Sequence, residues 1–585
     1  VYGKDIPLAP LLLVLIITPI TREVYFSLGF GGIIGTVILQ RDFWYGLLRY
    51  FDTLLPTTLQ GGFSKILLFM WLLGGVGGAA IRSGGVKGMG DSAAKFIKDS
   101  FLGQAVVYLM GFAIFMDDYA NTMIVGTALR AVTDRMRVSR EKLSFIVDCT
   151  ASPIAGVMPL STWIAHEITQ INLGLESVGW TGDSAYLLFL ESIPKRFYSW
   201  FMLTFVACSV LLGRDWAFMY YAEKRARETG AVCAVSSVEE RKDGDEPVKP
   251  PCSKGFTLVQ SSTHAEVVVK EGIPARWYNA AFPFFALVVM FMPLLFYNGA
   301  KHNKGGVGWD APARDIIGNA DSWATLHWVG GFTLMVQILF YAVQYNKEWG
   351  GMLMKPRETI DAAANGGIMY FKGGLALMLA FAYAQTLKDL QISKWLIDGL
   401  GDSLSPAELP ALAFVLCAVF SMATGTSWGT MTVFMPTVIP LSNYISPGDS
   451  ELMTTVISAV LGGAVWGDHC SPVSDTTILS AAASQVSLFD HTKTQLPYAA
   501  FTGIMAILLG FLPCGAGAPA GVCILLGVVL VPTFHFLLSL IPKFGGPVPI
   551  YDPQVDGITG QGLCGVVGSL KGLLGKEKAS PEGGE

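Results

Sequence analysis

The chain has 585 residues, of which 52% are hydrophobic and only 15% are charged, and its formal net charge at pH 7 is −5. Because a large soluble enzyme carries roughly 25% charged residues, this deficit excludes an ordinary soluble protein and indicates lipid as the solvent. The net charge itself excludes little, since charge in such a chain is sorted by side of the membrane.

Apolar runs recur along the whole chain. Several of them approach the ~20 residues that a helix needs to cross a bilayer. Strand-like alternation of apolar and polar residues is rare, which argues against a transmembrane barrel. The sequence therefore predicts an all-α polytopic membrane protein with about a dozen spans. The runs lie at residues 6–20, 24–39, 66–80, 200–212, 280–296, 328–343, 368–384, 412–420, 499–512 and 522–540.

Composition divides the chain into seven predicted segments. The segment between the halves is polar and of mixed charge, which is typical of a linker, here expected on the cytoplasmic side. The segments are N-terminal transmembrane helices (1–60), a first repeat with a re-entrant hairpin and a broken helix (61–213), the linker (214–275), connecting transmembrane helices (276–360), a second, inverted repeat (361–513), a C-terminal transmembrane helix (514–550) and a Gly-rich tail (551–585).

Each half contains polar interruptions inside otherwise apolar sequence. In the first half they are residues 116–122 (MDDYANT), followed by Ser152-Pro153 and by residues 159–162 (PLST). In the second half they are residues 424–430 (TGTSWGT) and 467–476 (GDHCSPVSDT). The interruptions occur in the same order at similar spacing, which is the pattern of two homologous halves that build one transporter.

Loop charge predicts the orientation of the two halves. The connection after the first interruption is strongly basic, whereas its counterpart at residues 441–452 has no Lys or Arg and carries Asp449 and Glu451. By the positive-inside rule the first connection faces the cytoplasm and the second faces away, so the repeats are predicted to be inverted. The basic residues are Arg130, Arg135, Arg137, Arg140 and Lys142.

Segment length predicts two re-entrant hairpins. The arm at residues 101–116 is too short to cross comfortably, so residues 101–132 are expected to enter from the cytoplasm and return, with residues 117–122 at the tip. Residues 414–439 would form the mirror hairpin, with residues 424–430 at its tip. Since non-helical backbone at membrane depth is tolerated only where it lines a cavity, the four polar breaks are expected to meet near the midplane.

Carboxylates in these breaks indicate an ion path. An ionised carboxylate at bilayer depth costs several kcal/mol, and such residues usually mark a substrate or proton route. A cation that loses its water shell needs carboxylate, hydroxyl and carbonyl oxygens. We predict that Asp118 and Asp475 hold Na⁺, with Asp148 as a further carboxylate beside the breaks. The full predicted set for cation and proton is Asp117, Asp118, Asn121, Thr122, Ser161, Thr162, Thr424, Thr426, Ser427, Asp468, Ser471, Ser474, Asp475 and Thr476.

Several of these residues also have structural interpretations. Asp117 and Asp118 can cap the returning helix, because carboxylates favour helix N-termini. Asp468 can pair with His469 or with the neighbours of Asp475. Asp475 stands where the first repeat has Thr162, and a purely structural repeat would not need this new charge. His166, next to Glu167, is either a satisfied core histidine or a proton relay.

Competition for the carboxylates predicts coupled exchange. Without a cation a buried carboxylate is expected to hold a proton near neutral pH, and cation binding expels that proton. No GxxxxGK(S/T) motif is present, so pumping driven by a P-loop ATPase is not supported. No cofactor is expected besides the transported Na⁺ and H⁺.

The polar breaks resemble the NhaC-type Na⁺/H⁺ antiporter family, which belongs to the larger ion transporter superfamily. The resemblance covers roughly residues 63–512, and its most specific part is the GDHCSPVSDT run at 467–476. Residues 193–198 (IPKRFY) also resemble a short element of that family. The resemblance implies paired re-entrant hairpins, broken helices and a homodimer with an elevator-like movement. The long linker and Gly-rich tail depart from the family pattern and leave regulation and cellular membrane open.

Three other functions compete with exchange of Na⁺, or Li⁺, for H⁺. Relatives of the family exchange organic acids or amino-acid-like solutes, so a Na⁺- or H⁺-coupled carrier of such a solute is the alternative. The absence of Lys and Arg from the polar breaks disfavours a simple anion but not a zwitterion. A channel would not need carboxylates inside inverted hairpins. An enzyme built on Asp468-His469-Cys470 is disfavoured, since adjacent residues on a helix point in different directions. The lipid bilayer is the expected partner, and no nucleic acid is expected.

Overall fold

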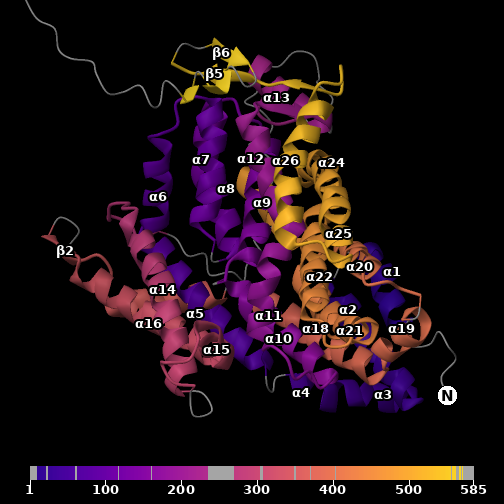
Figure 1. The fold of residues 1–585 in the computed structure, drawn as a ribbon. Coiled ribbons are helices and arrows are strands. Elements are labelled where there is room, and N and C mark those ends of the chain that lie inside the picture. The colour runs from indigo at the N-terminus through magenta and orange to yellow at the C-terminus, as the bar shows by residue number, and fades with distance from the viewer. Residues whose placement is uncertain are drawn as a thin grey trace, which may run out of the picture.

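The computed structural model describes residues 9–21, 24–58, 62–115, 117–159, 161–234, 269–302, 307–347, 351–368, 371–401, 403–554, 557–561, 565–567 and 569–570. Helices make up almost all of the regular structure, and the strands of the described part form three small two-stranded antiparallel sheets (Figure 1). The predicted all-α class is confirmed.

The first half of the chain begins with helices that run without long connections. Its elements are α1 (Ala9–Thr21), α2 (Val24–Gln40), α3 (Phe43–Arg49), a π-helical turn (Tyr50–Leu54), α4 (Leu55–Thr58), α5 (Gly62–Arg82), α6 (Gly85–Ala94), α7 (Ser100–Ala113), α8 (Asp118–Arg135), α9 (Arg140–Val157), α10 (Thr162–Ser177), α11 (Ala185–Ser192), a 3₁₀ turn (Ile193–Lys195), α12 (Phe197–Leu211), β1 (Arg214–Trp216) and α13 (Ala217–Thr229).

The second half is again helical and ends in short strands. Its elements are α14 (Tyr278–Tyr297), a π-helical turn (Asn298–His302), α15 (Ala313–Asn319), α16 (Ser322–Val343), β2 (Tyr345–Asn346), β3 (Gly351–Met352), α17 (Pro356–Ile368), α18 (Phe371–Asp389), α19 (Ile392–Leu400), α20 (Glu408–Thr424), α21 (Ser427–Ile445), α22 (Ser450–Cys470), α23 (Asp475–Ser484), α24 (Leu488–Met505), a π-helical segment (Ala506–Phe511), α25 (Leu512–Gly515), α26 (Ala520–Ser539), β4 (Gly545–Pro547), β5 (Pro549–Asp552) and β6 (Gly557–Gln561).

Five helices of the described part are long and apolar enough to cross a membrane, and counting two bent pairs as single spans raises the number to seven. The bent pairs are α5–α6, with an angle of 65°, and α9–α10, with an angle of 50°. This count is below the predicted dozen because other apolar helices, such as α7 and α20, are shorter than a full span. The five helices are Tyr278–Lys301, Ala324–Val343, Ser450–Cys470, Leu488–Gly515 and Ala520–Ser539.

Two helical hairpins occupy the predicted positions, but their tips are narrower than predicted. α7 ends at Ala113 and α8 begins at Asp118, so Asn121 and Thr122 lie in the first turns of α8 and not in a loop. The α20–α21 turn is only Gly425-Thr426, because Gly425 adopts a left-handed φ of 66° that ends α20 and Thr426 caps α21. The predicted tips, residues 117–122 and 424–430, were therefore too long, because α8 already begins at Asp118 and α21 at Ser427.

Each of the two helices predicted to be broken is interrupted over a few residues. α9 ends at Val157 and α10 begins at Thr162, while α22 ends at Cys470 and α23 begins at Asp475. Ser152-Pro153 does not break the chain, because Pro153 lies inside α9. The sequence interpretation of this Ser-Pro pair as an interruption is corrected accordingly.

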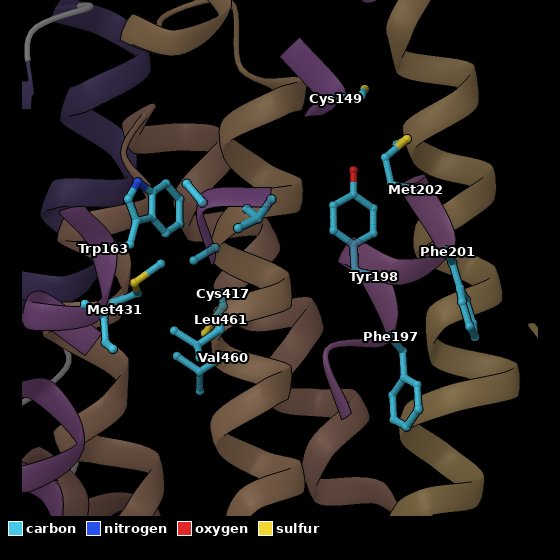
Figure 2. Packing of buried hydrophobic residues seen from close by; sticks show 14 of the residues in the cluster. Cys149, Trp163, Phe197, Tyr198, Phe201, Met202, Cys417, Met431, Val460 and Leu461 are labelled. Carbon is cyan, nitrogen blue, oxygen red and sulfur yellow. The ribbon is translucent and has the colours of Figure 1, made fainter. Parts of the chain in front are cut away.

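Hairpins and broken helices pack across the two halves. α8 packs against α23, and α21 packs against α10, so each hairpin contacts the broken helix of the other half. The core behind them is dense: Figure 2 shows Trp163 close to Met431, and Phe197, Tyr198, Phe201 and Met202 projecting from α12. The contact partners of the polar breaks are therefore fixed by packed apolar surfaces.

One end of the molecule is covered by segments that follow α12 and α26. β1 pairs with β4 in an antiparallel sheet, and β5 pairs with β6. α13 lies beside these strands (Figure 1). Residues 214–234 of the predicted linker are thus a strand, a packed helix and a short turn; residues 235–268 lie outside the described part of the chain.

Candidate functional site

Four helices begin at the polar breaks: α8, α10, α21 and α23. Thr162 Oγ1 of α10 donates to Asp117 Oδ2, just before α8, at 3.0 Å. The Tyr119 hydroxyl of α8 donates to Asp475 Oδ2 of α23. Contacts between these helix starts, completed by those in the next paragraph, form a closed ring that we call the N-terminal ring.

Asp468 and two tryptophans complete the N-terminal ring. Ser427 Oγ of α21 donates to Asp468 Oδ2 at 3.3 Å, and Asp468 in turn accepts from Ser474 at the start of α23. Trp163 of α10 meets Trp428 of α21 edge to face, with ring centroids 6.3 Å apart. The predicted meeting of the four polar breaks is therefore seen in the contacts of the described residues.

Asp468 is the most enclosed carboxylate of the ring. It is buried, and it accepts hydrogen bonds from Ser474 at 2.6 Å, Thr476 at 3.2 Å and Ser427 at 3.3 Å. Its backbone carbonyl accepts from Thr477 at 3.1 Å. Of the two structural interpretations, pairing with the neighbours of Asp475 is the observed one. Three hydroxyls around one carboxylate also form an oxygen-rich shell of the kind that hard cations bind.

Asp118 and Asp475 are the first residues of α8 and α23 and have the same local contact. Each opens a helix, and each accepts a hydrogen bond through Oδ1 from the next backbone N–H, at 3.1 Å from Tyr119 and 3.0 Å from Thr476. The capping interpretation is therefore locally correct for Asp118, and Asp475 makes the same contact at the start of α23. Asp118 is buried, whereas Asp475 is exposed, so Asp475 is the accessible carboxylate of the ring.

The carboxylates of the ring lie within electrostatic reach of one another. Asp118 interacts with Asp117, Asp468 and Asp475, and Asp468 interacts with Asp475. Like charges this close in a buried site repel, so the fully ionised set is unfavourable without cations or protons. The arrangement therefore binds positive charge in either form.

Asn121 and Thr122 differ in their role despite their adjacent positions. Asn121 Nδ2 donates to the carbonyls of Gly111, Ile114 and Thr150, at 2.7 Å, 3.1 Å and 3.1 Å, and so holds the hairpin tip against α9. The Thr122 hydroxyl is buried and has no hydrogen-bond partner in the described part of the chain. Asn121 Oδ1 is likewise buried without a hydrogen-bond partner among the described residues, so both side chains have an oxygen that could face a cation.

The other predicted hydroxyls serve mainly as caps. Ser161 Oγ accepts from Trp163 N at 3.2 Å and donates to Ala155 O at 2.7 Å. Thr426 Oγ1 accepts from Gly429 N at 3.2 Å, and Ser471 Oγ accepts from Val473 N at 3.3 Å. Thr424 Oγ1 donates to Phe420 O at 2.8 Å. These side chains thus fix the backbone conformation of the breaks.

His166 and Glu167 lie on α10 but differ in their surroundings. His166 stacks on Trp428, with centroids 4.8 Å apart, and its Nε2 lies 3.1 Å from Trp428 O. Glu167 forms a buried ion pair with Arg196 at 3.0 Å. Arg196 thus compensates the charge of Glu167 within the core. His166 packs against Trp428, one of the two tryptophans of the N-terminal ring.

Two features of the ring were not assigned from the sequence. Tyr119 lies within the 116–122 motif, yet its hydroxyl joins the two halves, and Trp428 lies within the 424–430 motif as the shared contact of Trp163 and His166. Each residue lies inside one of the polar motifs, and this position is the signal by which the sequence could have identified it. Among the described residues, no group of three His, Cys, Asp or Glu side chains is arranged around a common metal position.

Comparison with known proteins places the chain among transporters. An uncharacterised protein of Haemophilus influenzae is 28% identical over 546 residues, which are 89% of this chain and 94% of that protein. The malate-2H(+)/Na(+)-lactate antiporter of Bacillus subtilis is 30% identical over 133 residues, 21% of this chain and 28% of that protein. The Na(+)/H(+) antiporter NhaC of Alkalihalophilus pseudofirmus is 28% identical over 155 residues, 23% of this chain and 31% of that protein.

The sequence profile of the Na⁺/H⁺ antiporter family matches residues 154–514, which include the break between α9 and α10, α21 and the whole α22–α23 break. The match covers more than half of the chain and three of the four helix starts of the N-terminal ring. The chain is a multi-pass membrane transporter that belongs to the Na⁺/H⁺ antiporter family, as the NhaC-type resemblance predicted.

Proposed function

We propose that this protein exchanges Na⁺, and also Li⁺, for H⁺ across a membrane, with cation and proton competing for the carboxylates of the N-terminal ring. The observation that carries the proposal is the ring itself. Three buried carboxylates, Asp117, Asp118 and Asp468, and the exposed Asp475 interact around four helix starts whose polar breaks contain no Lys or Arg.

The proposed exchange follows from mutual exclusion. The cation reaches Asp475 first, because this carboxylate is exposed, and is then shared with Asp118 and nearby hydroxyls such as that of Thr122. Its charge stabilises the ionised carboxylates, so their protons leave. When the cation departs toward the other side, repulsion between the carboxylates favours renewed protonation. Coupling needs no ATP, since the two ions cannot occupy the ring together.

We further infer that the two halves are inverted. In Figure 1 the α7–α8 hairpin lies toward the end that carries α13 and β5, whereas α21 lies toward the opposite end with α19. The basic connection between α8 and α9 lies at the α13 end, where Arg140 N bonds to Val232 O. By the positive-inside rule this end, with the linker, faces the cytoplasm. From the family resemblance we also propose that the protein works as a homodimer with an elevator-like transport movement.

Reconstitution into proteoliposomes tests the proposal. With an imposed pH gradient, Na⁺ or Li⁺ should collapse the gradient, whereas Asp118→Asn and Asp475→Asn should each slow the response strongly. Asp134→Asn is the matched control, because Asp134 pairs with Arg140 at 2.9 Å on the basic connection and lies outside the ring. Wild-type rates in both ring variants would remove the site assignment.

A second candidate is a Na⁺- or H⁺-coupled carrier of a small organic acid or amino acid. Helix N-termini favour anionic groups, and four of them open into the ring, as in transporters that bind a substrate carboxylate there. The Bacillus subtilis relative is named for malate and lactate. Collapse of the pH gradient by malate, lactate or arginine, and not by Na⁺ or Li⁺ alone, would favour this candidate.

A further inference from the structure

A second cluster of buried polar side chains lies outside the N-terminal ring. Asp148 of α9 accepts through Oδ1 from Ser480 Oγ of α23, at 3.0 Å, and through Oδ2 from Gln495 Nε2 of α24, at 2.5 Å. His491, in the first turn of α24, places Nε2 3.6 Å from Asp148 Oδ2. All four side chains are buried, so helices of both halves converge on one carboxylate away from solvent.

His491 is not satisfied in this arrangement. Both ring nitrogens are buried, and neither has a hydrogen-bond partner among the residues that the structure describes. A neutral imidazole always carries one N–H donor, and hiding such a donor costs about 1–3 kcal/mol. The distance to Asp148 exceeds a hydrogen bond by about half an ångström. A small approach would therefore place a proton between Nε2 and Oδ2.

His535 of α26 shows the contrast within the same chain. It is equally buried, but its Nδ1 accepts from Trp216 Nε1 at 3.0 Å and its Nε2 lies 3.1 Å from Arg214 O. Both nitrogens of His535 are used by a neutral ring. Burial alone therefore does not explain the open nitrogens of His491.

The cluster lies between the basic end of the protein and the ring. The start of α24 adjoins α13, where Lys493 lies 4.8 Å from the Phe218 ring, and Figure 1 shows α24 reaching the α13 end. On the other side, Gln495 Nε2 also donates to His469 O at 2.8 Å, next to Asp468. Asp148 itself lies within electrostatic reach of Asp468.

The surroundings add few other charges. The titratable groups that face the pair come from α9, α12 and α22, and α23 supplies only the Ser480 hydroxyl. Lys142, in the first turn of α9, is held by Asp215 at 2.7 Å. Among the described residues, the facing groups are Cys149, Tyr198, Asp468, His469 and Cys470.

We propose that Asp148 and His491 form a proton-binding site that is separate from the N-terminal ring. Protons pass through this site between the α13 end of the protein and Asp468. When a proton binds, His491 becomes an imidazolium paired with the Asp148 carboxylate. When it leaves, Ser480 and Gln495 keep the carboxylate in place. The transport part of this inference rests on the proposed exchange; the proton site itself does not.

Transport by reconstituted protein tests the route. If protons reach Asp468 through this pair, His491→Gln should slow Na⁺-driven exchange about tenfold at alkaline pH, where protons are scarce, and much less at acid pH. The half-saturating Na⁺ concentration should not change. Asp148→Asn should act alike, and the double variant should be no slower than the slower single variant, because both residues serve one step. His535→Gln is the matched control, which should lower the melting temperature but keep the wild-type pH profile.

Proton uptake separates the two proposals. Detergent-solubilised wild type, acidified from alkaline pH in the absence of Na⁺, should take up about one proton per chain more than His491→Gln, read with a pH-indicator dye. Equal uptake, or a wild-type pH profile in both His491→Gln and Asp148→Asn, would overturn the proton site. If the wild type takes up the extra proton but its transport does not depend on Na⁺, the proposed exchange is overturned and the proton site is not. If one of the two variants does not fold, the pH profile and the proton uptake are both measured on the other.

Discussion

The Tyr119 hydroxyl donates a hydrogen bond to Asp475 Oδ2 and so joins the first turns of α8 and α23, helices of the two halves. Asp475 is the exposed carboxylate of the N-terminal ring, and Asp118, the residue before Tyr119, is buried. One side chain therefore connects the accessible carboxylate with the enclosed part of the site. Any cation that binds Asp475 Oδ2 must share this oxygen with the phenol or displace it.

Replacement of Tyr119 by Phe should weaken Na⁺ binding. The phenol stabilises the ionised form of Asp475, and a hydrogen bond to a charged group contributes about 1.5–3 kcal/mol. Without it the proton competes better, so the half-saturating Na⁺ concentration should rise about tenfold at neutral pH and less at alkaline pH. Sodium dependence of exchange in proteoliposomes checks both values. Tyr186→Phe is the control, since the buried Tyr186 hydroxyl has no hydrogen-bond partner in the described chain; an equal effect there would contradict the prediction.

The neighbours Asn121 and Thr122 should separate stability from transport. Asn121→Ala removes three donations to backbone carbonyls at the hairpin tip, so the free energy of unfolding should fall by roughly 2–4 kcal/mol. Thr122→Val removes a hydroxyl without a described partner and should leave stability within about 0.5 kcal/mol, while slowing Na⁺-driven exchange. Thermal unfolding in detergent and flux in proteoliposomes check the pair. Full activity of Thr122→Val would remove Thr122 from the site.

The sequence was a good guide to the polar breaks because each break is a local pattern. Ser161-Thr162 and Ser474-Asp475 open α10 and α23 at equivalent points, as the correspondence of Thr162 with Asp475 predicted. The exact tips were less predictable. Capping by Gly425 and Thr426 ends one helix and begins the next within two residues. Helix propensity does not locate the ends of helices with that precision.

Contacts between residues far apart in the chain could not be predicted from the sequence. β1 pairs with β4, two three-residue strands that lie at residues 214–216 and 545–547, and neither shows a pattern of its own. The meeting of Asp148 with His491 is of the same kind, since each is a single polar residue on its helix. Pairing of this sort is decided by how α9 and α24 pack, which composition does not encode.

The buried ion pair of Glu167 and Arg196 should be structural. Arg196→Met leaves the Glu167 charge in the core, and the free energy of unfolding should fall by about 3–5 kcal/mol. Replacing both, as Glu167→Leu with Arg196→Met, should recover most of this loss and retain Na⁺-driven exchange. Lys224→Ala, which breaks an exposed pair with Glu228, should change stability by less than about 0.5 kcal/mol. An inactive but stable double variant would show instead that Glu167 belongs to the ion path.

Glu223 of α13 should anchor the base of the α7–α8 hairpin. Its Oε1 accepts from Ser139 N, before α9, at 2.7 Å, and its Oε2 accepts from Gln104 Nε2 of α7 at 3.4 Å and from Arg227 Nη2 at 2.7 Å. Glu223 and Arg227 are both fully buried, so Glu223→Gln leaves the guanidinium without its directly paired carboxylate.

The expected loss for Glu223→Gln is about 3–5 kcal/mol in the free energy of unfolding, because the guanidinium stays in the core without its directly paired carboxylate. Since α13 holds both sides of the hairpin, exchange should also slow at temperatures where the protein remains folded. Glu228→Gln, on the exposed face of the same helix, is the matched control and should change neither value. Thermal unfolding in detergent, followed by flux below the melting temperature, checks both effects. A Glu223→Gln variant that melts and transports like the wild type would mean that α13 only covers this end and does not hold the hairpin.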